Sequence, residues 1–241
     1  MNDTEDYIVE HINDKKFKFP KEFDPSVNYS DEFYDEVIKV FLPNKRKRYF
    51  YRFIKRCFDF FVSLVCILLL SLVFIIVAIA IKCDSKGPVI FKQDRMGKSF
   101  KPFKCWKFRS MAVEAPKNMS TEDMEKGKSY VTKVGKFIRK TSIDELAQLF
   151  NILFGKMSII SYRPIILAEE SLNNMRNELG VFSIKPGITG FAQVHGRDNV
   201  TYKNKALMDA YYVKHASLWL DIKLIFNSAF AVLGRKGNHD N

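Results

Sequence analysis

The sequence is short of the residues that build disulfide frameworks and histidine-rich metal centres. Its four cysteines, Cys57, Cys66, Cys83 and Cys105, show no paired spacing, so they look like reduced structural thiols in a cytoplasmic protein. Only four histidines are present, and His195 has no second histidine at metal-ligand spacing. We therefore interpret His195 as a polar loop residue rather than a metal ligand or a base.

One long stretch lacks every residue that would mark it as ordinary surface. Phe60 to Ile81 run for 22 residues without a charge, a glycine or a proline. As a helix this stretch would be ~33 Å long at ~1.5 Å per residue, about the thickness of a bilayer's hydrocarbon core. Globular helices are seldom apolar all round for so long, and a signal peptide does not fit a stretch of this length that begins at residue 60. The stretch predicts insertion into a membrane.

Both flanks of the apolar stretch are basic, and this decides between two topologies. A simple span would put one basic cluster on the wrong side of the positive-inside bias, whereas a helix that enters and returns keeps both clusters in the cytoplasm. We therefore expect a re-entrant helix, bent modestly where the Ser71 hydroxyl can bond back to the carbonyl of Ile67. The basic residues are Lys45, Arg46, Lys47, Arg48, Arg52, Lys55 and Arg56 on one side and Lys82, Lys86, Lys92, Arg95 and Lys98 on the other.

Charge is distributed unevenly along the 241 residues. The chain has 39 Lys and Arg against 27 Asp and Glu, yet residues 1–44 hold eleven acids and five lysines. A basic body beside a membrane segment most simply faces anionic lipid head groups and phosphorylated substrates. No RNP, zinc-finger or helix-turn-helix signature supports a nucleic-acid partner, and we expect none. The competing class is a non-catalytic membrane-surface adaptor that binds anionic lipid or nucleic acid.

The chain divides into three parts. We expect an acidic N-terminal arm over residues 1–44, a basic interfacial segment with the re-entrant helix over 45–82, and a cytoplasmic catalytic domain over 83–241. The arm is interpreted as a solvated, loosely ordered leader. Its Phe and Tyr residues offer the alternative of docking on the body.

Hydrophobic periodicity in the body predicts the α+β class, with short strands and amphipathic helices around the membrane element. An interfacial helix is expected over 44–59, where basic and aromatic residues interleave, and the aromatic-rich second of the two C-terminal helices is a further candidate to lie on the membrane. The expected strands are 89–93, 103–109, 157–161 and 191–194, and the expected helices are 133–140, 141–153, 168–178 and two within 206–233. Residues 111–130 are expected to form a surface connection.

The segment 141–153 carries the most informative pair of acids. Ser142 and Glu145 fit a capping box, and an apolar face follows, so Asp144 and Glu145 have a structural explanation as first-turn carboxylates. The functional alternative is that the helix terminus, with Arg139 and Lys140 nearby, keeps Asp144 ionised and builds an anion site. Arg163 stands before a proline at a strand end, where it is placed for a phosphate or for a structural carboxylate.

Taken in order, these pieces resemble the bacterial sugar transferases, the monotopic phosphoglycosyl transferases. The match runs from about Lys55 to Leu233 and leaves the acidic arm outside. It rests on an apolar helix followed by the motifs DSKGPVIFKQDRMG (84–97), FKCWKFRSM (103–111), SIDELAQLFN (142–151), MSIISYRP (157–164), PGITGFAQVHGR (186–197) and YYVKHASLWLDIK (211–223).

The resemblance implies a function and a set of roles. Such enzymes transfer a phospho-sugar from a UDP-sugar to undecaprenyl phosphate at the cytoplasmic face of the bacterial inner membrane, release UMP and start a surface polysaccharide or glycoconjugate. By resemblance, Asp144 is the nucleophile and a ligand of Mg²⁺, and Glu145 is its catalytic partner. The residues implied for substrate binding or its support are Lys107, Arg139, Arg163, Arg197, Asp209 and Asp221. A homo-oligomer is left open.

The sequence departs from the family pattern at three positions. Leu72 follows Ser71 where the family breaks its membrane helix with a proline, so the kink here lacks the family's usual cause. Tyr162 alters the turn before Arg163, where Gly-Pro-Arg-Pro is usual. Ala147 replaces a proline that often follows the Asp-Glu-Leu run, a change that a helix accepts easily.

Overall fold

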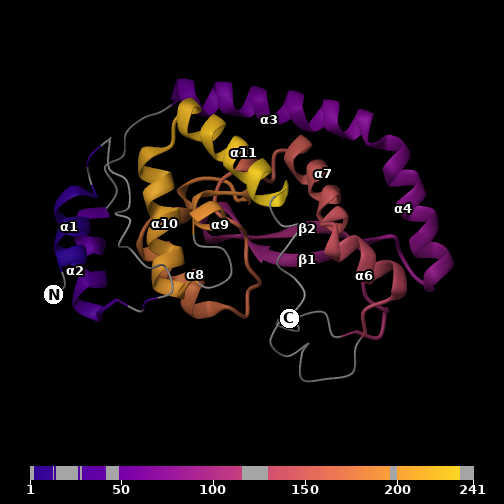
Figure 1. The fold of residues 1–241 in the computed structure, drawn as a ribbon, viewed down its shortest axis with the longest axis horizontal. Helices are drawn as coiled ribbons and strands as arrows, with labels where there is room; N and C mark the ends of the chain where they lie inside the picture. The colour runs from indigo at the N-terminus through magenta and orange to yellow at the C-terminus, as the bar shows by residue number, and fades with distance from the viewer. Residues whose placement is uncertain are drawn as a thin grey trace.

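A long bent pair of helices lies along one side of the molecule, and the rest of the body packs beneath it (Figure 1). The computed structural model describes residues 3–12, 14, 27, 29–41, 49–115, 130–195 and 200–233. In this part of the chain helices dominate, and the strands form two separate two-stranded sheets. The predicted α+β class is confirmed.

The apolar stretch forms two helices, α3 (Tyr49–Leu69) and α4 (Ser71–Asp84). Their axes differ by 63° across a break at Leu70. No single helix in the described residues is long and apolar enough to cross a membrane, whereas this bent pair is, judged by length and composition. We expected a modest bend at Ser71; the structure has a sharp bend one residue earlier.

Both helices are held against the body by apolar clusters. Leu70 packs against a cluster that contains Leu149 and Ile152. Further along, Val77 and Ile81 are buried in a second cluster. Phe74 of α4 packs against both clusters, so the two adjoin beneath the helix pair.

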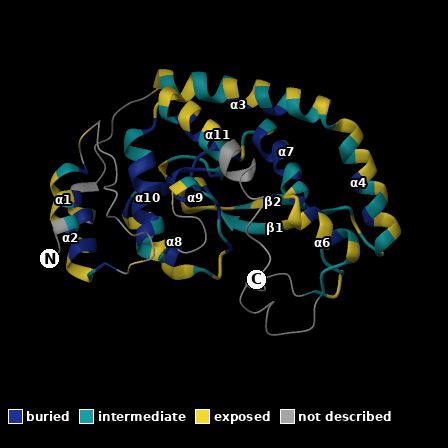
Figure 2. Cartoon of the chain, viewed as in Figure 1, coloured by how far each residue is buried: buried dark blue, intermediate teal, exposed yellow. Residues whose placement is uncertain are grey.

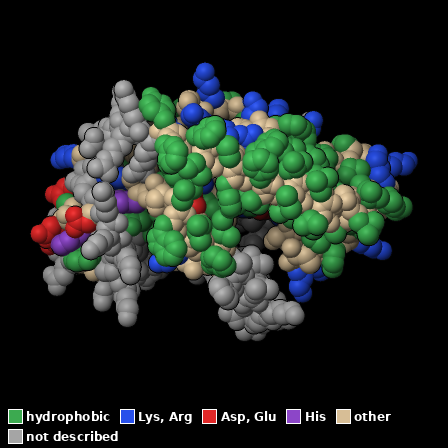
Figure 3. Space-filling model, turned by 90° about the horizontal axis from the view of Figure 1, so that it is seen from above, with side chains coloured by type: hydrophobic (Ala, Val, Ile, Leu, Met, Phe, Trp, Pro, Cys, Tyr) green, Lys and Arg blue, Asp and Glu red, His purple; other side chains and the backbone are tan. Residues whose placement is uncertain are grey.

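The outer face of the helix pair is apolar. Phe50 is 78% exposed and Leu69 is 77% exposed. Seen from above, hydrophobic side chains gather over this face, with Lys and Arg toward its edges (Figure 3). The C-terminal helix α11 (Leu218–Leu233) adds exposed Trp219 and Phe226. An exposed apolar surface of this extent marks an interaction face rather than ordinary protein surface.

The inner face of α3 is polar. Arg56 donates to two carbonyls at the C-terminal end of α7 (Gln148–Leu153), at 2.7 and 2.8 Å. Asp59 is buried and accepts from the Ile159 N–H at 3.0 Å. Tyr51 and Lys55 both donate to buried Asp221 of α11, each at 2.8 Å. This part of α3 is therefore inside-out relative to a helix on a soluble protein, with polar contacts toward the body and exposed apolar side chains outward. Figure 2 shows exposed and partly buried residues alternating along the helix.

The predicted hairpin is present. Strand β1 (Ile90–Met96) pairs antiparallel with β2 (Pro102–Phe108), and the short 3₁₀ turn η1 (Lys98–Phe100) joins them. The predicted basic helix is α6 (Lys133–Lys140), whose first turn is capped by the Thr132 hydroxyl. Asp84, at the end of α4, also accepts from the N–H of Val134 at 3.0 Å. Of the predicted connection 111–130, residues 116–129 lie outside the described chain.

A second, parallel sheet stands beside the hairpin. It joins β3 (Ser158–Ile160) to β4 (Gly187–Thr189) across a crossover that contains α8 (Glu170–Glu178) and the 3₁₀ turn η3 (Val181–Ser183). The predicted strand at 191–194 is wrong, because these residues begin the short helix α9 (Phe191–His195). Phe191 and His195 stack one turn apart with ring centroids 4.0 Å apart, a helical spacing that the β-like composition concealed.

The described residues of the acidic arm include two helices that pack on the body. Its helices α1 (Asp3–His11) and α2 (Asp31–Phe41) share a core with α10 (Tyr202–His215), in which Ile8 and Phe33 are fully buried. Asn204 donates to the carbonyl of Val27 at 2.6 Å. These residues therefore dock on the body, as the alternative expectation had it. The expectation of a loosely ordered leader is wrong for them.

The close approach of β4 to the chain after β3 depends on glycine. A Cβ placed on Gly190 would lie 1.8 Å from the carbonyl oxygen of Ser161. Gly180, by contrast, has a φ of +69° and open space around it. We expect Gly190→Ala to lower the free energy of unfolding by about 3 kcal/mol or more, because main chain would have to move. Gly180→Ala should cost only ~1–2 kcal/mol for its left-handed conformation. Thermal unfolding of both variants in detergent measures the difference, and equal midpoints would contradict it.

Candidate active site

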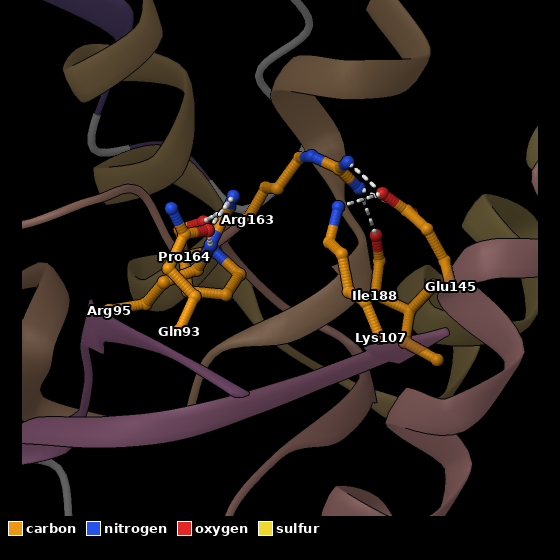
Figure 4. Close-up of polar contacts among 7 residues, drawn as sticks. All are labelled: Gln93, Arg95, Lys107, Glu145, Arg163, Pro164 and Ile188. Carbon is orange, nitrogen blue, oxygen red and sulfur yellow. Dashed lines mark hydrogen bonds and ion pairs between the residues drawn. The ribbon is translucent and has the colours of Figure 1, made fainter. Parts of the chain in front are cut away.

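Three segments that are distant in sequence meet at one carboxylate. Strand β2 supplies Lys107, the 3₁₀ helix η2 (Ile143–Ala147) supplies Asp144 and Glu145, and the turn after β3 supplies Arg163. Figure 4 shows Lys107 and Arg163 reaching Glu145 from different elements. The structure thus brings together four of the residues predicted for the site.

Glu145 is the centre of the ion pairs. Lys107 Nζ lies 2.8 Å from Oε1, and the Arg163 guanidinium contacts both oxygens, with Nη1 at 2.9 Å from Oε2 and Nη2 on Oε1. This is the bidentate arrangement that arginine makes with carboxylates. Burial alone would raise the pKa of Glu145, but the charges and hydrogen bonds of Arg163 and Lys107 hold it well below its usual value. Glu145 is therefore ionised at neutral pH.

The backbone around the two acids differs from the expected capping box. Ser142 is left-handed, with φ 57° and ψ 17°, and its side chain makes no capping hydrogen bond. Glu145 does not reach back to Ser142, because both of its oxygens are engaged with Lys107 and Arg163. The capping-box prediction is wrong. The continuous helix predicted over 141–153 is also split into η2 and α7.

Asp144 lies beside this cluster without a direct partner in it. Its side chain is buried at 8% exposure, and every ion pair of the site described here goes to Glu145. Burial raises the pKa of Asp144 above its usual value, while Lys107, Arg139 and Arg163 act in the opposite direction and Glu145 adds to the rise. The α-helix N-terminus expected at this acid is replaced by the short 3₁₀ turn η2, so the groups that favour the ionised form of Asp144 are the cations around it.

Arg139 reaches the site from a different helix. It stands in the last turn of α6 and acts electrostatically on Asp144. Together with Lys107 and Arg163 it makes the surroundings of Asp144 cationic. Such a set can bind an oxyanion with a dense negative charge.

The remaining predicted residues lie elsewhere. Asp209 is buried on α10 in an ion pair with Arg176 of α8, and Asp221 binds Tyr51, Lys55 and Tyr212 at the base of α3. In the described structure, then, these two acids make supporting contacts away from Glu145. Arg197 lies outside the described residues.

Two arginines near the site were missed by sequence reasoning. Arg95 was counted only as part of a basic flank, and Arg176 was not singled out. Both are held inside the body and donate to the main chain next to Arg163. The available signal for Arg176 was an arginine among the apolar positions of a short amphipathic helix; its partner on α10 could not be known without the fold.

The part of the chain that the structure describes contains no group of three or more His, Cys, Asp or Glu side chains placed to hold a metal ion. A Mg²⁺ ion, however, is commonly held by one or two carboxylates together with substrate phosphates and water. Asp144 is the carboxylate that remains for this purpose, because Glu145 is already bound on both oxygens. The site fits a metal that arrives with a phosphorylated ligand.

Cations surround a buried carboxylate beneath an exposed apolar helix pair, an arrangement that is able to bind a phosphorylated ligand. The comparisons agree: residues 50–235 match the bacterial sugar transferase family. The chain belongs to this family.

Several curated relatives are similar over most of the chain. It is 42% identical over 187 residues to the UDP-glucose:undecaprenyl-phosphate glucose-1-phosphate transferase of Klebsiella pneumoniae, covering 73% of this chain and 39% of that protein. It is 36% identical over 220 residues to the undecaprenyl-phosphate galactose phosphotransferase of Salmonella typhimurium, covering 85% and 46%. The UDP-N-acetylgalactosamine-undecaprenyl-phosphate N-acetylgalactosaminephosphotransferase of Aeromonas hydrophila is 38% identical over 190 residues, covering 76% and 44%. The chain thus spans less than half the length of these relatives.

The ion pair at the centre of the site should be strongly coupled. We expect a double-mutant cycle of Glu145→Gln and Arg163→Met to give a coupling free energy of about 1–3 kcal/mol, because the pair is bidentate and partly buried. The matched control is the exposed Lys104–Asp94 pair on the β1–β2 hairpin, at 2.6 Å with side chains 61% and 44% exposed. Its coupling should be below ~1 kcal/mol. Denaturant unfolding of seven proteins, the wild type being common to both cycles, measures both couplings, and equal couplings would contradict the assignment.

Proposed function

We propose that the chain is a sugar-1-phosphate transferase that moves a phospho-sugar from a UDP-sugar to undecaprenyl phosphate through a covalent intermediate on Asp144. The observation that carries this proposal is the unequal treatment of two adjacent acids. Glu145 is neutralised by Arg163 and Lys107, whereas Asp144 faces the same cations without an ion pair in the described cluster. Family membership and the names of the relatives support the reaction class.

The first step is an in-line displacement at the phosphorus that carries the sugar. A carboxylate oxygen of Asp144 forms a bond to this phosphorus, the bond to the bridging oxygen breaks, and UMP leaves with the electron pair. Lys107, Arg139 and Arg163 gather the diphosphate and stabilise the charge that develops on its oxygens. The product is an aspartyl phospho-sugar and free UMP.

The second step takes place at the same site and consumes the aspartyl intermediate. A phosphate oxygen of undecaprenyl phosphate attacks the phosphorus of the intermediate, and the acyl phosphate bond to Asp144 breaks, which restores the carboxylate. A covalent intermediate lets one small cationic site take two unlike substrates in turn. The two nucleophiles, the Asp144 carboxylate and the phosphate of undecaprenyl phosphate, need no general base when they are ionised. Glu145 is therefore assigned to hold Lys107 and Arg163 in position.

Mg²⁺ is proposed as the cofactor, with Asp144 as its protein ligand and the substrate phosphates as further ligands. When bound, it supplies positive charge to the diphosphate. Glu145 is not proposed as a ligand, because that would require breaking its contacts with Arg163 and Lys107.

The proposed lipid substrate fits the position of the site under the apolar face. Helix α7, which follows Asp144 and Glu145 directly, packs against α3 through Leu149 and Ile152. We propose that α3 and α4 form a re-entrant membrane element and that α11 lies at the interface, so that the protein is monotopic on the cytoplasmic side of the inner membrane. The reaction would begin a surface polysaccharide or glycoconjugate. Three relatives named for three different sugars leave the sugar to be found by assaying several UDP-sugars.

The covalent step predicts a labelled protein. Incubated with a UDP-sugar labelled in the sugar, without undecaprenyl phosphate, the wild type should release one UMP per site and retain the label. Asp144→Asn should do neither, because it keeps the shape but loses the nucleophile. Asp94→Asn, an exposed acid on β1, is the matched control and should behave as wild type. A wild type that retains no label, or turnover of Asp144→Asn near the wild-type rate, would contradict the two-step mechanism.

The re-entrant topology predicts that both flanks of the helix pair lie on one side. In a variant with all four cysteines replaced, single cysteines at Ser30 and at Ser99 should react with a membrane-impermeant reagent only when the cytoplasmic side is open. Ser30 precedes α3, and Ser99 follows α4. Labelling of the two positions from opposite sides of sealed vesicles would establish a true span instead.

A further inference from the structure

The turn that carries Arg163 is held through its main chain from two sides. Arg176 Nη1, on α8, donates to the carbonyl oxygen of Arg163 at 3.0 Å. Arg95 Nη1, on β1, donates to the carbonyl oxygen of the next residue, Pro164, at 2.5 Å. Figure 4 shows Arg95 meeting Pro164 on one side of Arg163, while the Arg163 side chain extends toward Glu145 on the other.

Each of these arginines is itself fixed. Arg176 donates from Nε and Nη2 to Asp209 Oδ2 at 3.0 and 2.6 Å, and both side chains are 1% exposed. The guanidinium also lies 5.4 Å from the ring centroid of Tyr162. Arg95 donates from Nε and Nη2 to Gln93 Oε1 at 3.2 and 3.0 Å. Neither arginine is free to swing away from the carbonyl that it holds.

The chain just before this point is tied as well. Ser161 donates to the carbonyl of Thr189, and Tyr162 accepts from Gly187, both at 2.8 Å. With the contacts of Arg176 and Arg95, the main chain is held at every residue from Ser161 to Pro164. The only long side chain of this segment that points to the ion-pair cluster is then that of Arg163.

A buried ion pair such as Arg176–Asp209 is weak evidence for added stability. Removing two charges from water is costly, and buried ion pairs can often be replaced by apolar residues of similar volume without loss of stability. One oxygen of Asp209, Oδ1, is buried without a hydrogen-bond partner. The remaining donor of Arg176, Nη1, bonds to the main-chain carbonyl of Arg163. Apolar residues in place of the pair could not make this hydrogen bond.

We propose that Arg95 and Arg176, the latter backed by Asp209, are positioning residues that place the Arg163 guanidinium on Glu145 and on the diphosphate. The effect on turnover rests on the proposed function; the effect on the Arg163–Glu145 ion pair does not. Asp209, implied by resemblance to bind or support substrate, is a supporting group in this assignment.

The decisive variant is Arg176→Met combined with Asp209→Leu. It removes both buried charges together, so neither is left unpaired, and it deletes the donor to the Arg163 carbonyl. We expect a folded protein whose kcat for UMP release falls about 10- to 100-fold, because a small displacement of a positioning group is enough for such a loss. In an Arg163→Lys background the same pair of substitutions should cause less than about a threefold further loss, since it acts through Arg163.

The matched control is Lys203→Met with Asp31→Leu. This ion pair also involves α10 but joins it to the arm, with Asp31 85% exposed. It should leave turnover unchanged. Arg95 gives an independent test: Arg95→Met should reduce kcat, and Arg95→Lys, which keeps one donor for the Pro164 carbonyl, should recover part of it.

A folded Arg176→Met/Asp209→Leu protein with turnover within about threefold of wild type would overturn the proposal. So would an equal proportional loss with and without Arg163→Lys. If the wild type turns over no UDP-sugar, the proposed function fails. The positioning role of Arg95 and Arg176 is then tested by thermal unfolding alone. The non-additivity of the thermal midpoints in the Glu145→Gln and Arg163→Met cycle should then be smaller in the Arg176→Met/Asp209→Leu background. An unchanged non-additivity would refute the positioning role.

Discussion

The site depends on the carboxylate of Glu145 more than on any other group. Three cations, Lys107, Arg139 and Arg163, come from three different elements and converge on a partly buried space. Without a central negative charge their mutual repulsion and desolvation would oppose folding. Glu145 satisfies two of them at once and so allows a cationic site to exist before any substrate arrives. The adjacent Asp144 then meets positive charge that is already organised.

The same logic extends outward from the site. The turn that carries Arg163 is fixed by buried Arg176 and partly buried Arg95, and α7, which follows the two acids, receives Arg56 of α3 on its last carbonyls. Several joints between elements near the site are therefore side chains bonded to main chain. Such joints fix position more narrowly than apolar contacts, which tolerate sliding and repacking.

The sequence allowed the class and most elements to be predicted, and the failures have physical causes. The 3.6-residue and two-residue periodicities were sufficient for α6, for the β1–β2 hairpin and for the two C-terminal helices. Periodicity failed at 191–195, where a five-residue helix is too short to show its repeat. The capping box at Ser142 failed because a tertiary ion pair took the Glu145 side chain.

The candidate site was predictable only in part. Lys107, Asp144, Glu145 and Arg163 were found because motifs carried them, and the fold brings them together. Arg176 and Asp209 are 33 residues apart and meet only through the packing of α8 on α10, which no local pattern reports. The helix pair likewise packs on two clusters to which later segments contribute. Long-range packing, rather than local propensity, decided what was missed.

The inside-out polarity of α3 has a consequence for how the chain is assembled. Its polar contacts join residues that are 96 to 170 positions apart, reaching α7, β3 and α11. During synthesis the helix therefore leaves the ribosome long before any of its docking partners exist. For that interval both of its faces are unsatisfied, one apolar and one charged. The proposed insertion into lipid would cover the apolar face while leaving the charged face in water, so delivery to the bilayer should precede folding of the body beneath it.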